Sequence, residues 1–278
     1  MFILPDYPHS TSSFTPLERA IAVHRLKQSN GALDQERGSP LRGLRMAVTD
    51  YKTWLLAIII ITKTSAGAVT SFIPTVINTF GYSKVQTLLL VAPPYVFATI
   101  AALIISFTSD KRGERAYHIV VPIFFAMAGY IMAAATMTLA VRYLAIFLML
   151  GGVYGSYNVA LAWISSTLPR PLEKRAAGIA LINTVGNLAQ IYSPYLYLKE
   201  DGPRYLKAMV ANSAFCLACL GATLVLRWCL RRENEKLDRL EAEHVVEIEK
   251  IGKEDAQVEM VEERVEVVGG HKGYRYVL

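Results

Sequence analysis

Lys63 is the side chain best suited to binding chemistry, because it is a cation inside a long apolar segment. It follows Trp54, where that segment begins, by nine residues, and so lies about 13 Å along a helix rising about 1.5 Å per residue. An ammonium left in lipid costs on the order of 3 kcal/mol, so we expect Lys63 to face a cavity or a partner. Either it anchors a substrate carboxylate, or it snorkels or bonds a backbone carbonyl. Small and polar residues share its helical stripe: Gly67, Thr70, Pro74 and Asn78.

A second polar stripe consists of side-chain amides. Asn183, Asn187 and Gln190, followed by Pro194, recur at offsets of 0, 4, 7 and 11 and therefore occupy one face of a helix. Amides inside a membrane helix must turn toward other helices or toward water. This face either lines a cavity and hydrogen-bonds a polar substrate, or it holds neighbouring helices together.

Tyrosines next to glycines and prolines complete the candidate site. Tyr154 and Asn158 form an i, i+4 pair beside Gly151 and Gly155, whose spacing favours close helix packing. Tyr95 directly follows Pro93-Pro94, and these prolines, like Pro74, leave carbonyls one turn earlier as free acceptors or bend the helix. The predicted substrate-binding residues are Lys63, Asn78, Tyr95, Tyr154, Asn158, Asn183, Asn187 and Gln190.

A charged loop has a different predicted role. In the run DKRGER, Asp110 stands at a helix end, with Arg112 and Arg115 beside it. An acid and bases at this position can form ion pairs between helices that hold one conformation. We therefore predict that Asp110, Arg112 and Arg115 form a conformational latch rather than a binding site.

Other chemistry lacks support in the sequence. There is no GxGxxG, Walker loop, HExxH or nucleophile elbow, so we expect no enzyme activity, cofactor or metal. The three cysteines, Cys216, Cys219 and Cys229, fall in the last apolar segment and are interpreted as small packing residues. No Asp or Glu lies inside any apolar segment, so a proton-coupling carboxylate would have to lie elsewhere.

Six long apolar segments must position these side chains. The chain of 278 residues is 53% hydrophobic, and each segment exceeds the roughly 20 residues needed to cross a bilayer as a helix. Runs such as LLAIIIIT do not alternate as barrel strands do. The sequence therefore predicts an all-α membrane protein with six transmembrane helices: Trp54–Phe80, Thr87–Phe107, Tyr117–Leu139, Tyr143–Leu168, Ala176–Leu198 and Tyr205–Leu230.

The distribution of charge predicts the orientation. Residues 233–278 carry 7 of the 29 Lys and Arg and 13 of the 23 Asp and Glu, so residues 1–232 carry 22 and 10. Lys and Arg number seven before the first span and three in each of the second-to-third and fourth-to-fifth loops, against one, one and three in the alternate loops. The positive-inside rule then places both termini in the cytosol. Because the basic residues flank the spans, we expect membrane lipid rather than nucleic acid as a partner.

The chain divides into three predicted regions. Residues 1–52 form a cytosolic connector, in which Thr15, Pro16 and Glu18 predict a capped helix running to about Lys27 and residues 41–46 an interfacial approach to the membrane. Residues 53–231 form the six-span transmembrane part. Residues 232–278 hold an amphipathic cytosolic helix, to about Ile251, and a mobile acidic tail.

Several sequence stretches together resemble one family. They are FILPDYPHSTSSFTPLERAIAVHRL, PTVINTFGYS, LLLVAPPYVFA, SDKRGER, INTVGNLAQIYSPYLY, DGPRYL and GYRYVL. The chain resembles the major facilitator superfamily, and within it the fungal anion:cation symporters of the allantoate, pantothenate and nicotinate permease type. In that family an LPD-P segment follows the sixth helix, and the charged loop lies between the second and third helix of each half; its opening glycine is Ser106 here.

The resemblance covers only the second half of such a transporter. It implies secondary transport, with proton-coupled uptake of small organic anions such as nicotinate or related carboxylates, through a multi-pass protein of the plasma membrane. One half cannot enclose a site made at the repeat interface. We therefore expect the chain to be a C-terminal half or fragment that works with a missing N-terminal half, or a self-associating half. The alternative is a transport-inactive truncated paralogue that pairs with full-length carriers.

Overall fold

The computed structural model describes residues 14–22, 39–78, 81–168, 170–251 and 275–278, without the side chains of residues 78, 199 and 244–251. The chain forms two compact units, residues 1–39 with 239–274 and residues 40–238 with 275–278. In the first unit residues 16–22 are helical. The Glu18 amide donates to Thr15 Oγ1 at 3.4 Å, and the Thr15 amide donates to Glu18 Oε2 at 3.0 Å. This reciprocal pairing confirms the predicted cap; the end expected near Lys27 lies outside the described residues.

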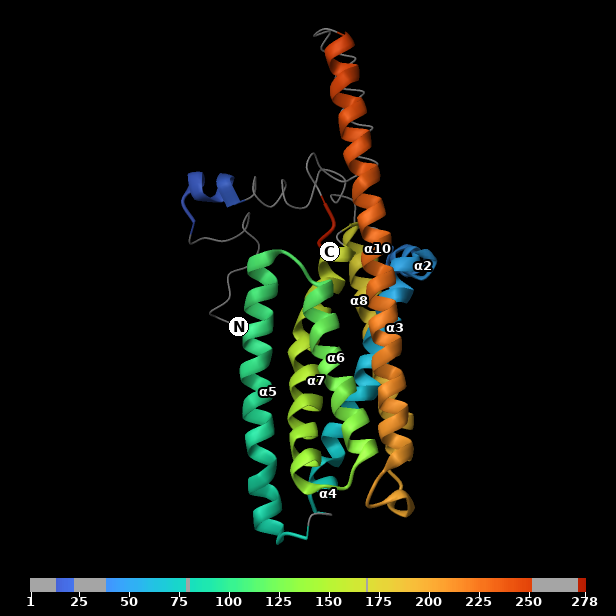
Figure 1. Ribbon diagram of the computed structural model, residues 1–278. Coiled ribbons are helices and arrows are strands. Elements are labelled where there is room, and N and C mark those ends of the chain that lie inside the picture. The colour runs from blue at the N-terminus through green and yellow to red at the C-terminus, as the bar shows by residue number, and fades with distance from the viewer. Residues whose placement is uncertain (1–13, 23–38, 79–80, 169, 252–274) are drawn as a thin grey trace. The chain divides into compact units, whose positions relative to one another are not determined.

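The second unit is helical, and the described residues contain no strand. Figure 1 shows α5, α6 and α7 side by side, and α7 packs against both of the others. The elements are α2 (Pro40–Thr49), α3 (Tyr51–Gly67), η2 (Ala68–Phe72), α4 (Ile73–Asn78), α5 (Lys84–Arg112), α6 (Ala116–Ala135), α7 (Leu139–Thr167), α8 (Leu172–Asn187), α9 (Ala189–Tyr192), η3 (Ser193–Leu196), η4 (Lys199–Asp201) and α10 (Leu206–Ile251).

Five helical stretches of the described chain are long and apolar enough to cross a membrane. They match the first four and the last of the predicted spans: Tyr51–Ile77, Lys84–Arg112, Ala116–Ala135, Leu139–Thr167 and Leu206–Glu243. The remaining predicted span, Ala176–Leu198, forms α8, α9 and η3, so no single helix there reaches spanning length. The Leu188 amide bonds the carbonyl of Val185, three residues back, at 3.2 Å, and this tighter turn interrupts the α-helical ladder. The backbone of Leu188 stays right-handed helical, so the chain continues in the same sense.

The boundaries of α5 follow from its sequence. Ser83 and Gln86 form a capping box at its start. At its end Gly113 has a φ of 64°, a left-handed conformation that glycine adopts without a steric penalty. Within the helix Pro94 cannot donate to the carbonyl of Leu90, and the Tyr143 hydroxyl of α7 donates to that carbonyl at 3.0 Å. A freed carbonyl was predicted at this proline.

Ion pairs tie helix ends together on the side of the second unit predicted to be cytosolic. Lys52 of α3 pairs with Glu233 of α10 at 2.6 Å. Lys174 of α8 pairs with Asp50, the N-cap of α3, at 2.6 Å. In α2, the predicted interfacial approach, Gly43 and Ala47 are buried, and a Cβ at Gly43 would lie 2.6 Å from the backbone of α8. This approach therefore packs on the start of α8.

Two features of the C-terminal region go beyond the sequence predictions. First, the helix predicted from Arg232 to about Ile251 is present, and it continues the last span without interruption as α10, from Leu206 to Ile251. Second, residues 275–278, at the end of the tail predicted to be mobile, are bonded to α7 and α10, while residues 252–274 of that tail lie outside the described residues. Tyr276 donates its amide to Asn234 Oδ1 at 2.8 Å and accepts from Asn234 Nδ2 at 2.9 Å, while Trp163 donates to the carbonyl of Val277 at 2.8 Å. Composition predicted mobility, but these long-range bonds satisfy the backbone of the last residues.

Candidate functional site

The side chain of Lys63 lies inside the second unit, where α3 meets α7. It is 1% exposed and donates to Ser156 Oγ of α7, and the ring of Tyr157 lies 5.8 Å from its ammonium. Ser156 Oγ also donates to the carbonyl of Gly152 at 2.7 Å, so its single hydrogen is used there and it accepts from Lys63. Among the residues described, no carboxylate pairs with Lys63.

This arrangement leaves the ammonium with capacity to bind more. Lys has three N–H donors, and the Ser156 hydroxyl accepts one. Tyr157 adds an attraction between cation and aromatic ring, which acts within about 6 Å. A buried cation is costly unless it is paired, so the position favours an incoming anion. Because Lys63 is 1% exposed, an anion reaches it only when the surrounding side chains open.

The amide-bearing helix contacts α3 at the same level. Gly186 of α8 packs so closely on α3 that a Cβ there would lie 2.6 Å from Ile60 and 3.8 Å from Thr64. Six residues further, Tyr192 of α9 shares a hydrogen bond of 2.5 Å with Ser65. Ser156 on α7 and Gly186 on α8 therefore meet α3 within about a turn of Lys63.

The predicted amide side chains are exposed rather than packed. Asn158 of α7, Asn183 and Asn187 of α8 and Gln190 of α9 are all exposed. Asn158 is two residues from Ser156, so it lies about 3 Å further along α7 and on nearly the opposite face of that helix, while Asn187 directly follows Gly186. Exposed amides at this depth in a membrane protein face water or other helices rather than lipid. Lipid chains are therefore a poor environment for the polar surfaces of α7, α8 and α9.

The two tyrosines lie together. The hydroxyl of Tyr95 donates at 3.2 Å to the carbonyl of Thr70 in η2, four residues before Pro74, which cannot supply the α-helical donor. The rings of Tyr95 and Tyr154 are 6.1 Å apart, and Tyr154 is 37% exposed. Tyr95 therefore supports the irregular centre of the first span, whatever it contributes to binding.

The predicted site residues are only partly brought together. Lys63 contacts α7 between Tyr154 and Asn158, but it is buried whereas the amides are exposed. The Asn187 amide donates to the carbonyl of Asn183 on its own helix at 2.9 Å. The side chain of Asn78 lies outside the described residues. No group of three metal-ligating side chains gathers within the described part of the chain.

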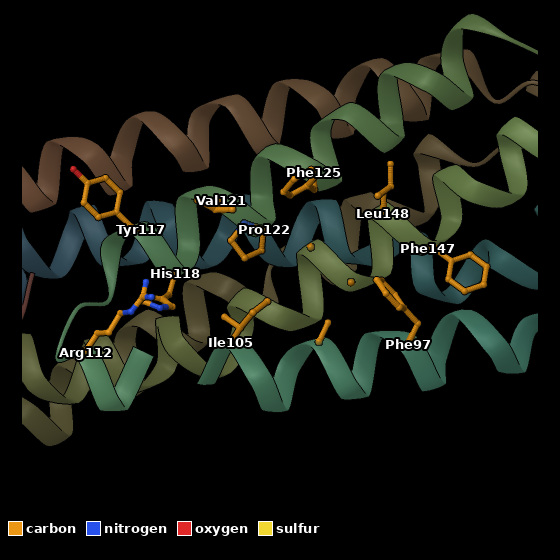
Figure 2. Close-up of a pocket in the computed structure, with 13 residues that line it drawn as sticks. Phe97, Ile105, Arg112, Tyr117, His118, Val121, Pro122, Phe125, Phe147 and Leu148 are labelled. Carbon is orange, nitrogen blue, oxygen red and sulfur yellow. The ribbon is translucent and has the colours of Figure 1, made fainter. Parts of the chain in front are cut away.

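The three residues predicted to form a latch do not all interact with one another. Arg115 pairs with Asp110 at 2.7 Å across the turn from α5 to α6. Arg112 instead lines a groove between α5, α6 and α7, shown in Figure 2. The neighbouring Glu114 pairs with Arg227 of α10 at 3.0 Å, and this link was not predicted.

Sequence reasoning also missed the partners of Lys63. Ser156 and Tyr157 lie between the predicted Tyr154 and Asn158, and their spacing from Lys63, which depends on how two helices pack, is not visible in the sequence. Gly155 is no signal for this contact, because it faces Ile105 of α5 rather than α3.

Comparison with known proteins finds one family and several transporters that are similar to this chain. The Major Facilitator Superfamily model matches residues 1–194. The major facilitator-type transporter hxnP of Emericella nidulans is 27% identical over 87% of this chain and 50% of its own length. The high-affinity nicotinic acid transporter of Saccharomyces cerevisiae is 27% identical over 68% of this chain and 36% of its own. A putative tartrate transporter of Agrobacterium vitis is 33% identical over 81% and 52%. The chain spans about half the length of the curated relatives that it matches.

Proposed function

The chain belongs to the major facilitator superfamily, and we propose that it acts as the second half of a secondary transporter for small organic anions such as nicotinate or related carboxylates. The observation that carries this proposal is the buried ammonium of Lys63, which has no carboxylate partner among the described residues, in a helical unit whose α7 and α8 also expose amides. A cation and amides together suit a ligand with one carboxylate and further polar atoms.

In this proposal each group has a role. Lys63 binds the carboxylate once Tyr157 and its neighbours open, because a charged hydrogen bond is the strongest contact that the site offers. Asn158, Asn183, Asn187 and Gln190 hydrogen-bond the rest of the ligand or its water. Another six-helix half covers this face, so that the site lies at the interface of the two halves.

The names of the relatives support the substrate class. One is described as a transporter of nicotinic acid and another as a putative transporter of tartrate, and both molecules are small carboxylic acids.

We extend the proposal to topology and gating. Both termini lie in the cytosol of a plasma-membrane protein, and the Asp110–Arg115 and Glu114–Arg227 pairs hold the cytosolic ends of α5, α6 and α10 in one conformation. In a chain whose own cysteines are replaced by serine, an impermeant thiol reagent outside the cell should label Glu200→Cys and not Lys111→Cys. The reverse labelling would reject this orientation.

Lys63→Gln tests the role of the ammonium in a carrier rebuilt with a first half. Glutamine keeps a hydrogen-bond donor and removes the charge, so apparent affinity for nicotinate should fall by about 10- to 150-fold, the equivalent of about 1.5–3 kcal/mol. Affinity is measured per carrier that reaches the membrane. Lys84→Gln is the matched control, because Lys84 stands at the exposed start of α5. Unchanged affinity in Lys63→Gln would remove this residue from the site.

A further inference from the structure

An apolar groove of about 480 Å³ runs between α5, α6 and α7, within the size range of small-molecule sites. Phe97 and Ile105 of α5 form one side and Val121 and Phe125 of α6 form the other, as Figure 2 shows. Gly151 and Gly152 of α7 also line it. None of the amides of the proposed substrate site lines this groove.

Polar groups gather at one end of this groove. Figure 2 shows the side chains of Arg112 and His118 beside each other there, with Phe97 and Phe147 toward the other end. His118 Nδ1 is buried and has no hydrogen-bond partner within the described part of the chain. Arg112 is exposed and lies at the last position of α5, where a helix end borders the membrane surface. Two nitrogen-bearing side chains thus lie at one end of the apolar groove.

The glycines determine how close α5 lies to α7. A Cβ at Gly151 would lie 2.7 Å from the Phe97 ring, and a Cβ at Gly155 would lie 2.5 Å from Ile105. These contacts hold α5 against α7. The space of the groove therefore lies on the side of α5 and α7 that faces α6. The surface of α5 around it exposes large apolar side chains, including Phe97, Ile100 and Ile104. Such a surface at membrane depth faces lipid chains.

We propose that this groove binds one anionic phospholipid, with an acyl chain along Phe97, Val121 and Phe125 and the phosphate at Arg112 and His118. Apolar walls fit the chain, and the cationic guanidinium at one end fits the negative headgroup. The predicted orientation places Arg112 at the cytosolic surface, where anionic lipids gather and basic pockets between helices bind them. A zwitterionic phospholipid would meet the same walls without the net charge.

Native mass spectrometry of the full chain in detergent tests this site with two probes, dioleoylphosphatidylserine and dioleoylphosphatidylcholine. We expect one phosphatidylserine per chain, bound about tenfold more tightly than phosphatidylcholine, and a loss of about tenfold or more in Arg112→Gln with His118→Gln, as expected for a lost charged hydrogen bond. Phosphatidylcholine binding should fall by a smaller factor, because its phosphate meets the same two side chains but the lipid carries no net charge. Lys111→Gln is the matched control, because Lys111 is an exposed neighbour that does not line the groove.

Leu148→Trp fills the groove and should abolish binding of both lipids, while Arg112→Lys keeps a cation and should retain most of the preference for phosphatidylserine. Thermal unfolding without added lipid shows which variants fold. If the double variant does not fold, the comparison of the unchanged chain with Arg112→Lys and Leu148→Trp replaces it. Equal binding of the two lipids would overturn the proposal. So would phosphatidylserine binding that survives Leu148→Trp, or a dimer of the chain that Leu148→Trp abolishes without affecting either lipid.

Discussion

Lys63 occupies a position that is poor for stability and suited to binding. Its ammonium is 1% exposed and has a serine hydroxyl and an aromatic ring nearby, with no acid bonded to it in the described chain. Burying a charge is unfavourable unless it is fully paired, and apolar replacements of similar volume are often neutral or stabilising. A residue retained only for stability would not be a buried cation without an acidic partner.

Lys63→Met should therefore leave the thermal unfolding temperature of the purified chain unchanged or raise it. Methionine fills a similar volume without a charge to desolvate, and Ser156 keeps its bond to the carbonyl of Gly152. Differential scanning fluorimetry in detergent measures the effect, with Lys84→Met as the exposed control. A fall of several degrees in Lys63→Met alone would mean that the ammonium serves the fold.

At the scale of single helices, tyrosine hydroxyls compensate for prolines. Pro74 cannot supply the α-helical donor to the Thr70 carbonyl of η2, and the Tyr95 hydroxyl of α5 adds a donor there. This bond links the irregular centre of the first span to the second. It gives Tyr95 a defined structural effect that can be separated from any effect on substrate.

Tyr95→Phe should lower the free energy of unfolding by about 1 kcal/mol, because the carbonyl of Thr70 loses its donor. Pro74→Ala offers a backbone donor in place of the hydroxyl, so Tyr95→Phe should cost less in that background. Denaturant unfolding of the four proteins gives the coupling between the two sites. Additive effects would show that the hydroxyl does not compensate for the proline; Tyr154→Phe controls for loss of a partly exposed hydroxyl.

The last four residues of the tail make hydrogen bonds that composition did not predict. Asn234 pairs with both backbone groups of Tyr276, much as a neighbouring strand would. Asn234→Leu removes both bonds, at a cost of about 1–3 kcal/mol. Amide hydrogen exchange at residues 275–278 should accelerate, with Lys236→Gln, on an exposed part of the same helix, as the control. Unchanged exchange in Asn234→Leu would show that other contacts hold the tail.

The helices could be predicted from sequence because apolar length and caps are local properties. The capping box at Thr15 and the freed carbonyl before Pro94 are set by neighbours in the chain, and the structure has both. The three-residue hydrogen bond at Leu188, the serine beside Lys63 and the partner of Glu114 depend on packing between distant segments. No spacing within one helix reveals these. Only the chemical types of the site residues could therefore be read from the sequence, and not which of them are buried.

At the scale of the whole molecule, the all-α half of a major facilitator fold presents amides where lipid is a poor environment. Asn158, Asn183, Asn187 and Gln190 need water or another set of helices against them. The relatives extend to about twice the matched length, which is where such a covering half would come from. Transport is thus a property that we expect of two halves together.

Uptake of labelled nicotinate by cells without their own permease tests this central claim most directly. We compare the chain alone, a first half from the Saccharomyces cerevisiae nicotinic acid transporter alone, and the two expressed together, with surface amounts measured in each case. The account predicts background uptake for either half alone and uptake above background for the pair, reduced at low substrate by Lys63→Gln. Uptake by this chain alone at the level of the pair would contradict the account, because the exposed amide face would then need no other half.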